Sequence, residues 1–128
     1  MKYVLLIHHA EAYLSQTPPE EQERITESHR QLQANGKDDG SYLGAVRLAP
    51  TGTAVSIRRK GGSSVVVDGP FTETKEQLVG FYVFESESRD SVKERAAQIK
   101  MFPTGTVEVR PILWSHPGMS LSGDGQTE

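Results

Sequence analysis

The amino-acid sequence predicts an α+β fold, a ferredoxin-like βαββαβ domain with an inserted β-hairpin. Three observations lead to this prediction. The runs Tyr3–His8 and Leu78–Phe84 are apolar at successive positions, as in strands that are covered on both faces. A segment with helical spacing follows each of these runs. Between them, Gly61-Gly62 separates two short strand-like segments, as in a hairpin.

Length and composition define the class of protein. The 128 residues form one domain, for which we expect residues 1–114, followed by a flexible tail at 115–128. The absence of cysteine excludes disulfides, thiolate metal centres and thiol nucleophiles, and it indicates a cytoplasmic protein. The net charge of −3 argues against a nucleic-acid partner, and the N-terminal apolar run is too short to cross a membrane.

Signals for the start of a helix follow the first strand. Thr17 is predicted to cap this helix, Pro18 takes the first helical position, where its missing N–H costs nothing, and Glu20 closes a capping box. The stripe predicted to face the core is thin and consists of Ile25, His29 and Leu32. Gly36 is predicted to end the helix, and residues 37–40 are predicted to form a turn.

The second strand and the hairpin come next. The second strand is predicted at Tyr42–Leu48, and the hairpin strands at residues 53–57 and 64–67 are joined by a tight turn at residues 60–63. Arg58–Lys60 form a basic cluster near the hairpin tip, which is typical of a protected sheet edge.

The third core strand precedes the second helix. Gly80 lies at the centre of this strand and indicates a close backbone approach or a bulge. Ser88 or Asp90 can cap the helix, which is predicted to end at Phe102-Pro103. Its apolar stripe consists of Val92, Ala96 and Ile99.

The last strand is predicted at Thr106–Leu113, with Pro111 marking an edge or a strand end. In a ferredoxin-like sheet both helices cover one face. Because the first and third core strands are apolar on both sides, the second face would expose a hydrophobic surface on a monomer. Two sheets packed face to face would bury this surface, and we therefore expect a homodimer.

A continuous motif at Val66–Tyr82 reads VVDGPFTETKEQLVGFY. It resembles the signature of the DGPF proteins, a branch of the YCII-related family. The opening MKYVLLI with Glu11, the LAPT segment at 48–51 and the GTVEVRP segment at 105–111 resemble the same family in the same order. The resemblance extends over nearly the whole chain except the tail.

The resemblance implies a dimeric α+β barrel of two ferredoxin-like subunits, in agreement with the strand pattern. YCII-related proteins are usually described as candidate enzymes with a His and an Asp in a pocket. Many DGPF members are encoded beside extracytoplasmic-function sigma factors. The resemblance implies no established reaction. We expect no cofactor, because the sequence has no phosphate-binding glycine loop or dinucleotide fingerprint.

The DGPF turn supplies the first candidate site residues. Asp68 is a candidate acid or base, because a carboxylate beside a pocket can transfer protons once its pKa approaches the working pH. Alternatively, Asp68, Gly69 and Pro70 only shape the chain, since Asp-Gly-Pro is common in turns. Phe71 either lines the pocket or packs in the core, which we favour. Lys75 offers a charge to an anionic ligand or remains solvated.

Histidines and one arginine supply the other candidates. His29 is a candidate catalytic partner of Asp68 or a hydrogen-bonded core residue. His8 and His9 suggest a metal, but neighbouring strand residues point to opposite faces and no pair with metal-ligand spacing exists elsewhere, so we expect no metal. His8 stays a candidate ligand-binding residue. Arg47 either binds a substrate carboxylate or points to solvent.

Two functions are consistent with these residues. The first is a small-molecule-binding protein or enzyme with a pocket near Asp68. The second is a non-catalytic homodimeric accessory protein that engages a regulatory partner such as a sigma factor. A closed, partly apolar pocket with convergent polar groups would favour the first function, because an adaptor needs no such pocket.

Overall fold

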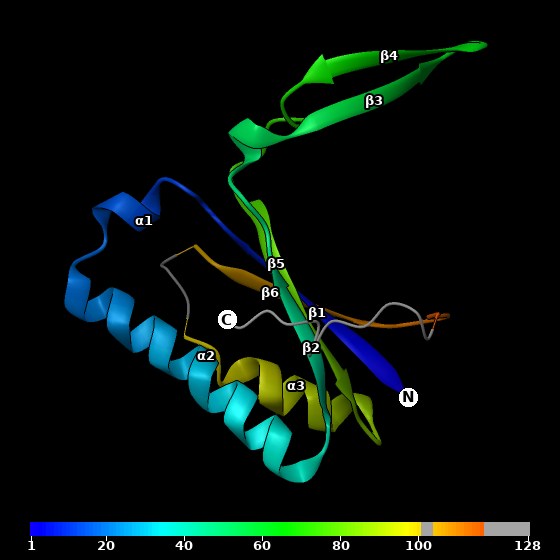
Figure 1. Cartoon of the computed structure of the whole chain (residues 1–128). Helices are drawn as coiled ribbons and strands as arrows, with labels where there is room; N and C mark the ends of the chain where they lie inside the picture. The colour runs from blue at the N-terminus through cyan, green and yellow to red at the C-terminus, as the bar shows by residue number, and fades with distance from the viewer. Residues whose placement is uncertain (101–103, 117–128) are drawn as a thin grey trace, which may run out of the picture.

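The computed structural model describes residues 1–100 and 104–116, which form a two-layer body and a projecting hairpin (Figure 1). The sheet of the body contains four strands, in the spatial order β2 (Tyr42–Arg47), β5 (Gln77–Glu85), β1 (Lys2–His9) and β6 (Thr106–Pro111). All neighbouring strands run antiparallel. The α+β class predicted from the sequence is therefore confirmed.

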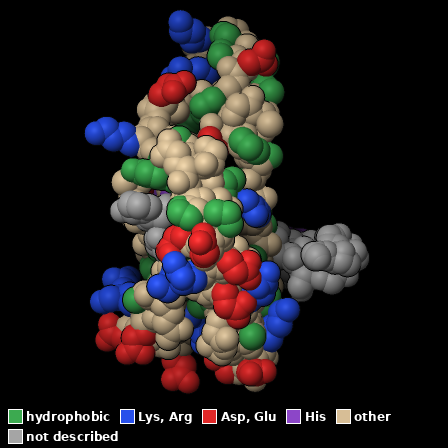
Figure 2. Space-filling view, turned by 90° about the vertical axis from the view of Figure 1, so that its left-hand side faces the viewer, with side chains coloured by type: hydrophobic (Ala, Val, Ile, Leu, Met, Phe, Trp, Pro, Cys, Tyr) green, Lys and Arg blue, Asp and Glu red, His purple; other side chains and the backbone are tan. Residues whose placement is uncertain are grey.

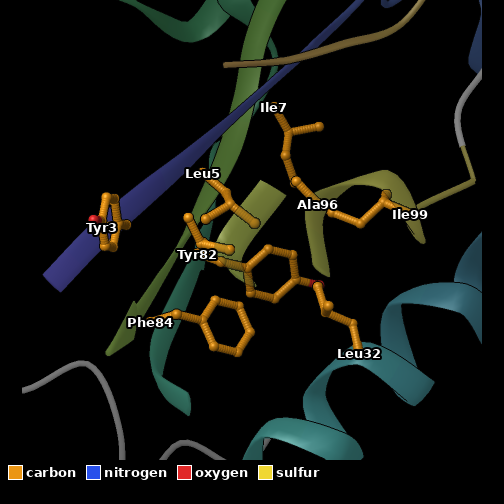
Figure 3. Packing of buried hydrophobic residues seen from close by; sticks show 9 residues of the cluster. Tyr3, Leu5, Ile7, Leu32, Tyr82, Phe84, Ala96 and Ile99 are labelled. Atoms are coloured by element: carbon orange, nitrogen blue, oxygen red, sulfur yellow. The ribbon is translucent and has the colours of Figure 1, made fainter. Parts of the chain in front are cut away.

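Two helices, α2 (Pro19–Asp39) and α3 (Arg89–Ala97), cover one face of this sheet (Figure 1). Side chains of β1 and β5 point from this face toward Leu32 of α2 and Ala96 of α3 (Figure 3). The core consists of Tyr3, Leu5, Ile7, Leu32, Tyr82, Phe84, Val92, Ala96 and Ile99. The predicted stripes of both helices thus face the core, with His29 half-buried between Ile25 and Leu32.

The other face of the sheet is also apolar. The strand register places Val4 beside Val83 and Leu6 beside Phe81, and Phe81 in turn beside Val46. We call these five side chains the open face, because neither α2 nor α3 lies on this side of the sheet (Figure 1). In the single chain Val83 is buried and the other four are half-buried.

The boundaries of α2 differ from the prediction. The helix begins at Pro19, one residue later than predicted, and Pro18 precedes it without any side-chain cap. Thr17 is not the cap, because its hydroxyl donates to the Tyr13 carbonyl oxygen at 2.6 Å and closes the short helix α1 (Tyr13–Gln16), which was not predicted. The sequence signals were correct in kind but were used by two helices instead of one.

The prediction that Gly36 ends α2 is wrong. The helix continues for another turn and ends at Gly40, whose φ of 78° is the left-handed conformation that favours glycine. Gly36 is buried inside the helix, where a Cβ would lie 2.7 Å from a ring carbon of Phe84 and 2.8 Å from the Cβ of Tyr42. Gly36 therefore allows α2 to pack closely on the sheet.

Gly80 has the role that its position predicts. A Cβ at this residue would collide with the Val46 carbonyl oxygen of the neighbouring strand β2. The register between β1 and β5 also shifts at this point, between Ile7 and His8. Close approach and irregular pairing thus occur together at one glycine.

The inserted hairpin consists of β3 (Val55–Lys60) and β4 (Ser63–Asp68), and its prediction is confirmed; among the described strands, these two pair only with each other. We call residues 55–68 the arm. The arm projects beyond the end of the four-stranded sheet, on the side away from the helices (Figure 1). Figure 2 shows hydrophobic side chains on the upper part of the molecule, where the arm lies, and charged side chains crowded on the lower part.

The remaining elements start where the sequence predicts but end earlier. Ser88 caps α3, since its hydroxyl accepts the Ser91 N–H at 3.1 Å. β6 ends at Pro111, two residues before the predicted end at Leu113, and lies at the edge of the sheet, so the role predicted for Pro111 is confirmed.

The predicted helix end at 102–103 is wrong. α3 already ends at Ala97, where the Gln98 N–H donates to the Arg95 carbonyl oxygen. Ile99 of the predicted stripe therefore reaches the core from beyond the helix. The tail beyond residue 116 lies outside the described residues.

Candidate functional site

Polar side chains gather where β1 and β2 end and β5 begins. His9 shares a strand face with the buried Ile7, and Arg47 shares one with Ala45, which packs on the core. Both side chains therefore lie on the helix-covered side of the sheet. The residue between the two strands at this level is Gly80, which presents no side chain to α2.

A hydrogen-bonded chain connects α2 to this part of the sheet. The Tyr82 hydroxyl oxygen lies 2.7 Å from Nδ1 of His29, and Nε2 of Gln33 donates to the same oxygen at 3.2 Å. Because Gln33 donates to this oxygen, the Tyr82 proton is available for Nδ1 of His29. The imidazole then carries its own proton on Nε2 and can donate it to another group.

Burial and charge set the protonation of this chain. Burial, followed by the electrostatic effects of Arg47 and of His9, holds the pKa of His29 below its usual value. Burial also raises the pKa of the Tyr82 phenol, so that Tyr82 remains a donor. The His29 imidazole is thus held neutral beside two basic side chains, an arrangement suited to an oxyanion.

Glu11 connects the end of β1 to the base of the arm. Its carboxylate accepts the Thr51 N–H at 2.9 Å and the Thr51 hydroxyl at 2.8 Å. The Glu11 N–H donates to the Gln77 side-chain oxygen at 2.8 Å. These bonds fix the short helix η1 (Thr51–Thr53), which leads into the arm.

The DGP turn lies at the base of the arm, away from His29. Asp68 is exposed and ends β4. The Gly69 N–H donates to the Ala54 carbonyl oxygen at 2.7 Å, and the Gly69 carbonyl accepts the Ser56 hydroxyl at 2.7 Å. Gly69 has a φ of 99°, a conformation that favours glycine, and it closes the base of the arm just after β4. The turn therefore has the structural role that the sequence offered as the alternative.

The other predicted site residues are dispersed. The interpretation of Phe71 as a core residue is wrong, because 71% of its surface is exposed. Pro70 beside it is half-buried, and Lys75 is exposed. His8 faces the side of the sheet opposite to His9, as the alternation of the strand requires. Of the predicted residues, the structure brings together His29 and Arg47.

Two shallow hollows lie elsewhere on the surface. One, of about 170 Å³, lies between α2 and α3 and is lined by Asn35, Ser91, Glu94, Arg95 and Gln98. The other, of about 330 Å³, lies at the far end of the sheet and is lined by Met1, Lys2, Glu85 and residues 112–115. Neither includes Asp68 or His29. Within residues 1–100 and 104–116, no three side chains of His, Asp or Glu form a cluster that could hold a metal ion.

Sequence reasoning missed two members of the hydrogen-bonded chain, Tyr82 and Gln33. Gln33 lies four residues after His29 and therefore on the same face of the helix. Tyr82 lies two residues from Gly80 and from Phe84, on the strand face that the pattern predicts to be covered. Both signals were present, but only the packing of α2 on β5 shows that they meet.

Comparison with known proteins places the chain in a family. The family model of the YCII-related domain matches residues 1–115. An uncharacterised protein of Rhizobium meliloti, R00369, is 36% identical over 120 residues, which is 92% of this chain and 97% of that protein. No helix in the described part of the chain is long and apolar enough to cross a membrane. This match over most of its length shows that the chain belongs to the YCII-related domain family.

Proposed function

We propose that this protein is a homodimeric small-molecule-binding protein that binds an anionic group of its ligand between His29, Arg47 and His9. The observation that carries the proposal is the hydrogen-bonded chain from Gln33 through Tyr82 to His29. The proposed site lies at the ends of β1 and β2 rather than around the exposed Asp68.

The hydrogen bonds from Gln33 through Tyr82 to His29 are difficult to explain by their contribution to stability alone. Tyr82 is only 4% exposed, and its hydroxyl requires partners that a phenylalanine would not need. The partners that it has, Gln33 and His29, fix the tautomer and the direction of an imidazole beside two basic residues. Preorganised groups of this kind bind ligands better than mobile ones, because less conformational entropy is lost on binding.

The ligand class follows from the charges. Arg47 is exposed, and its guanidinium can form a bidentate ion pair with a carboxylate or a phosphate. The neutral His29 can donate its Nε2 proton to an oxygen of the same group. If the bound ligand reacts, the same donor can stabilise negative charge that develops on a carbonyl oxygen.

The dimer part of the proposal rests on the strand order and on the open face. The order β2-β5-β1-β6 with both helices on one side supports a ferredoxin-like subunit. Two such subunits stacked through Val4, Leu6, Val46, Phe81 and Val83 would form the dimeric α+β barrel of the DGPF branch. Both subunits would contribute the same residues to this contact, as a two-fold axis requires.

A thermal-shift screen against small carboxylates and phosphates tests the ligand site. We expect an anion to stabilise the wild-type protein by roughly 2.7 kcal/mol at about a hundred times its dissociation constant. The stabilisation should be lost in His29→Gln and in Arg47→Gln. It should persist in the matched control His8→Gln, because His8 lies on the other face of the sheet.

Two results would contradict the proposed site. One is a screen in which no carboxylate or phosphate stabilises the folded wild-type protein. The other is a shift that Asp68→Ala abolishes and His29→Gln preserves, which would move the site to the arm. The alternative function predicted from the sequence, an accessory protein linked to sigma-factor regulation, stays a prediction.

A further inference from the structure

The arm exposes apolar side chains on both of its faces. Ile57 is 70% exposed, and it lies beside Val66 across the ladder, next to Val55 on the same face. Val65 and Val67 are exposed on the opposite face. A two-stranded hairpin is at best marginally stable in water unless it packs on something else. Apolar surface of this extent on a projecting element is typical of a contact with another molecule.

The direction of the arm is fixed at its root. The Glu11 carboxylate holds Thr51 through two hydrogen bonds, and the Leu48 N–H donates to the Val79 carbonyl oxygen at 2.9 Å. The Gly69 N–H closes the other side of the root on Ala54. The arm is thus presented on the side of the sheet away from the helices, where a second sheet would stack (Figure 1).

A second group of exposed apolar residues lies at the opposite end of the sheet. It surrounds the hollow of about 330 Å³, where Leu113 is fully exposed and Trp114 is 76% exposed. We call this hollow, lined by Met1, Lys2, Glu85 and residues 112–115, the end hollow. It lies where β1 begins and β5 ends, whereas the arm leaves the sheet where β1 ends and β5 begins.

The arm tip is basic, whereas the end hollow carries charges of both signs. The arm carries three cations close to its tip, Arg58, Arg59 and Lys60, all of them exposed. At the end hollow, Glu85 is followed by the exposed Glu87. Glu85 is paired with the N-terminal ammonium. A contact between the two regions would therefore rest on the apolar part of the arm meeting Leu113 and Trp114, with Glu87 as the carboxylate open to the basic tip.

We propose that in the homodimer the arm of each subunit docks in the end hollow of the other subunit. This inference rests on the homodimer of the proposed function and adds a second contact to it. If the two-fold axis lies between the two stacked sheets and perpendicular to the strands, the strands of the second sheet run opposite to those of the first. Such an axis places the arm end of each subunit over the hollow end of the other, and both contacts form at once.

The dimensions are compatible with this arrangement. The 8 residues of β1 span about 27 Å, and each arm strand of 6 residues spans about 20 Å, so an arm can reach beyond the end of a stacked sheet. The exposed apolar side chains of one arm amount to roughly 400 Å². Burial of part of this surface on the other subunit would add to the area buried between the stacked sheets.

Because the chain has no cysteine, engineered disulfides test this contact directly. We expect the double variant Ile57→Cys/Leu113→Cys to form a covalent dimer on mild oxidation, seen on a non-reducing gel. Neither single variant should do so, because Ile57 meets Leu113 of the other subunit and not its own copy. The control Ile57→Cys/Ala97→Cys should remain uncrosslinked, since Ala97 lies on α3 on the other side of the sheet.

A second measurement does not depend on cysteine chemistry. Sedimentation equilibrium should show a dimer dissociation constant at least tenfold higher in Ile57→Asp than in wild type. The control Thr26→Asp on the exposed side of α2 should leave the constant unchanged.

The outcomes separate this inference from the proposed homodimer. A dimer that does not crosslink through 57 and 113, and whose dissociation is unchanged in Ile57→Asp, would overturn the arm contact and leave the stacked dimer intact. A folded protein that remains monomeric at every concentration would overturn both and would assign the arm to a different protein.

Discussion

The body and the arm contain the same kinds of strand residue but surround them differently. In the body, Leu5 and Phe84 are fully buried between the sheet and the two helices. In the arm, Val66 and Ile57 form an equally regular cross-strand pair and remain exposed. The comparison shows that a strand pattern predicts how the backbone pairs, whereas burial depends on what lies above the strand.

Core truncation should produce the largest difference between the two regions. We expect Phe84→Ala to lower the free energy of unfolding by about 3–5 kcal/mol, because the cavity lies among fully packed neighbours. Truncation of the exposed arm residue Ile57 to Ala should cost less than about 0.5 kcal/mol. Urea unfolding of the monomer at high dilution measures both, and equal losses would contradict the division into body and arm.

A smaller effect is expected where α2 packs on the sheet. Gly36→Ala places a methyl group against Tyr42 and Phe84, a clash that costs about 1–3 kcal/mol, while better helix propensity returns up to about 1 kcal/mol. We expect a net loss of about 1–2 kcal/mol. The control Gly52→Ala, with no atom within 4 Å of the new Cβ, should be within about 0.5 kcal/mol of wild type. A stabilised Gly36→Ala would show that the contact is not tight.

Lowering the pH should reduce the stability of the body through protonation of His29. Its pKa is lower in the folded protein than in the unfolded chain, so the unfolded state binds the proton first as the pH falls. The stability from this residue is therefore fully present above about pH 6.5 and is lost as the pH falls toward the folded pKa. Thermal unfolding between pH 8 and pH 5 should fall less steeply in His29→Gln, and an identical slope would contradict the neutral imidazole.

Much of the body followed from its sequence because local signals and burial agree there. The two apolar strands, Ser88 as a helix cap and Gly80 as a point of close approach were all predicted correctly. The failure at Gly36 has a tertiary cause. Glycine inside a helix is unfavourable on its own, and only the ring of Phe84 against the helix explains its presence.

The candidate site was predicted less completely than the fold. His29 and Arg47 were identified by residue type, but their common neighbourhood depends on how α2 crosses β5. Asp68 was predicted from the DGP motif, and in the structure the Gly69 N–H of this motif closes the base of the arm on the Ala54 carbonyl oxygen. A motif of turn residues identifies a conformation, and it does not by itself distinguish a site from a hinge.

Amide hydrogen exchange at two protein concentrations, one below and one above dimer dissociation, tests most directly the claim that the arm is half of an interface. We expect the protection of the amides of β3 and β4 to rise at least tenfold in the dimer, because the arm is covered only there. Unchanged exchange in the arm, in samples that sedimentation shows to pass from monomer to dimer, would contradict the account.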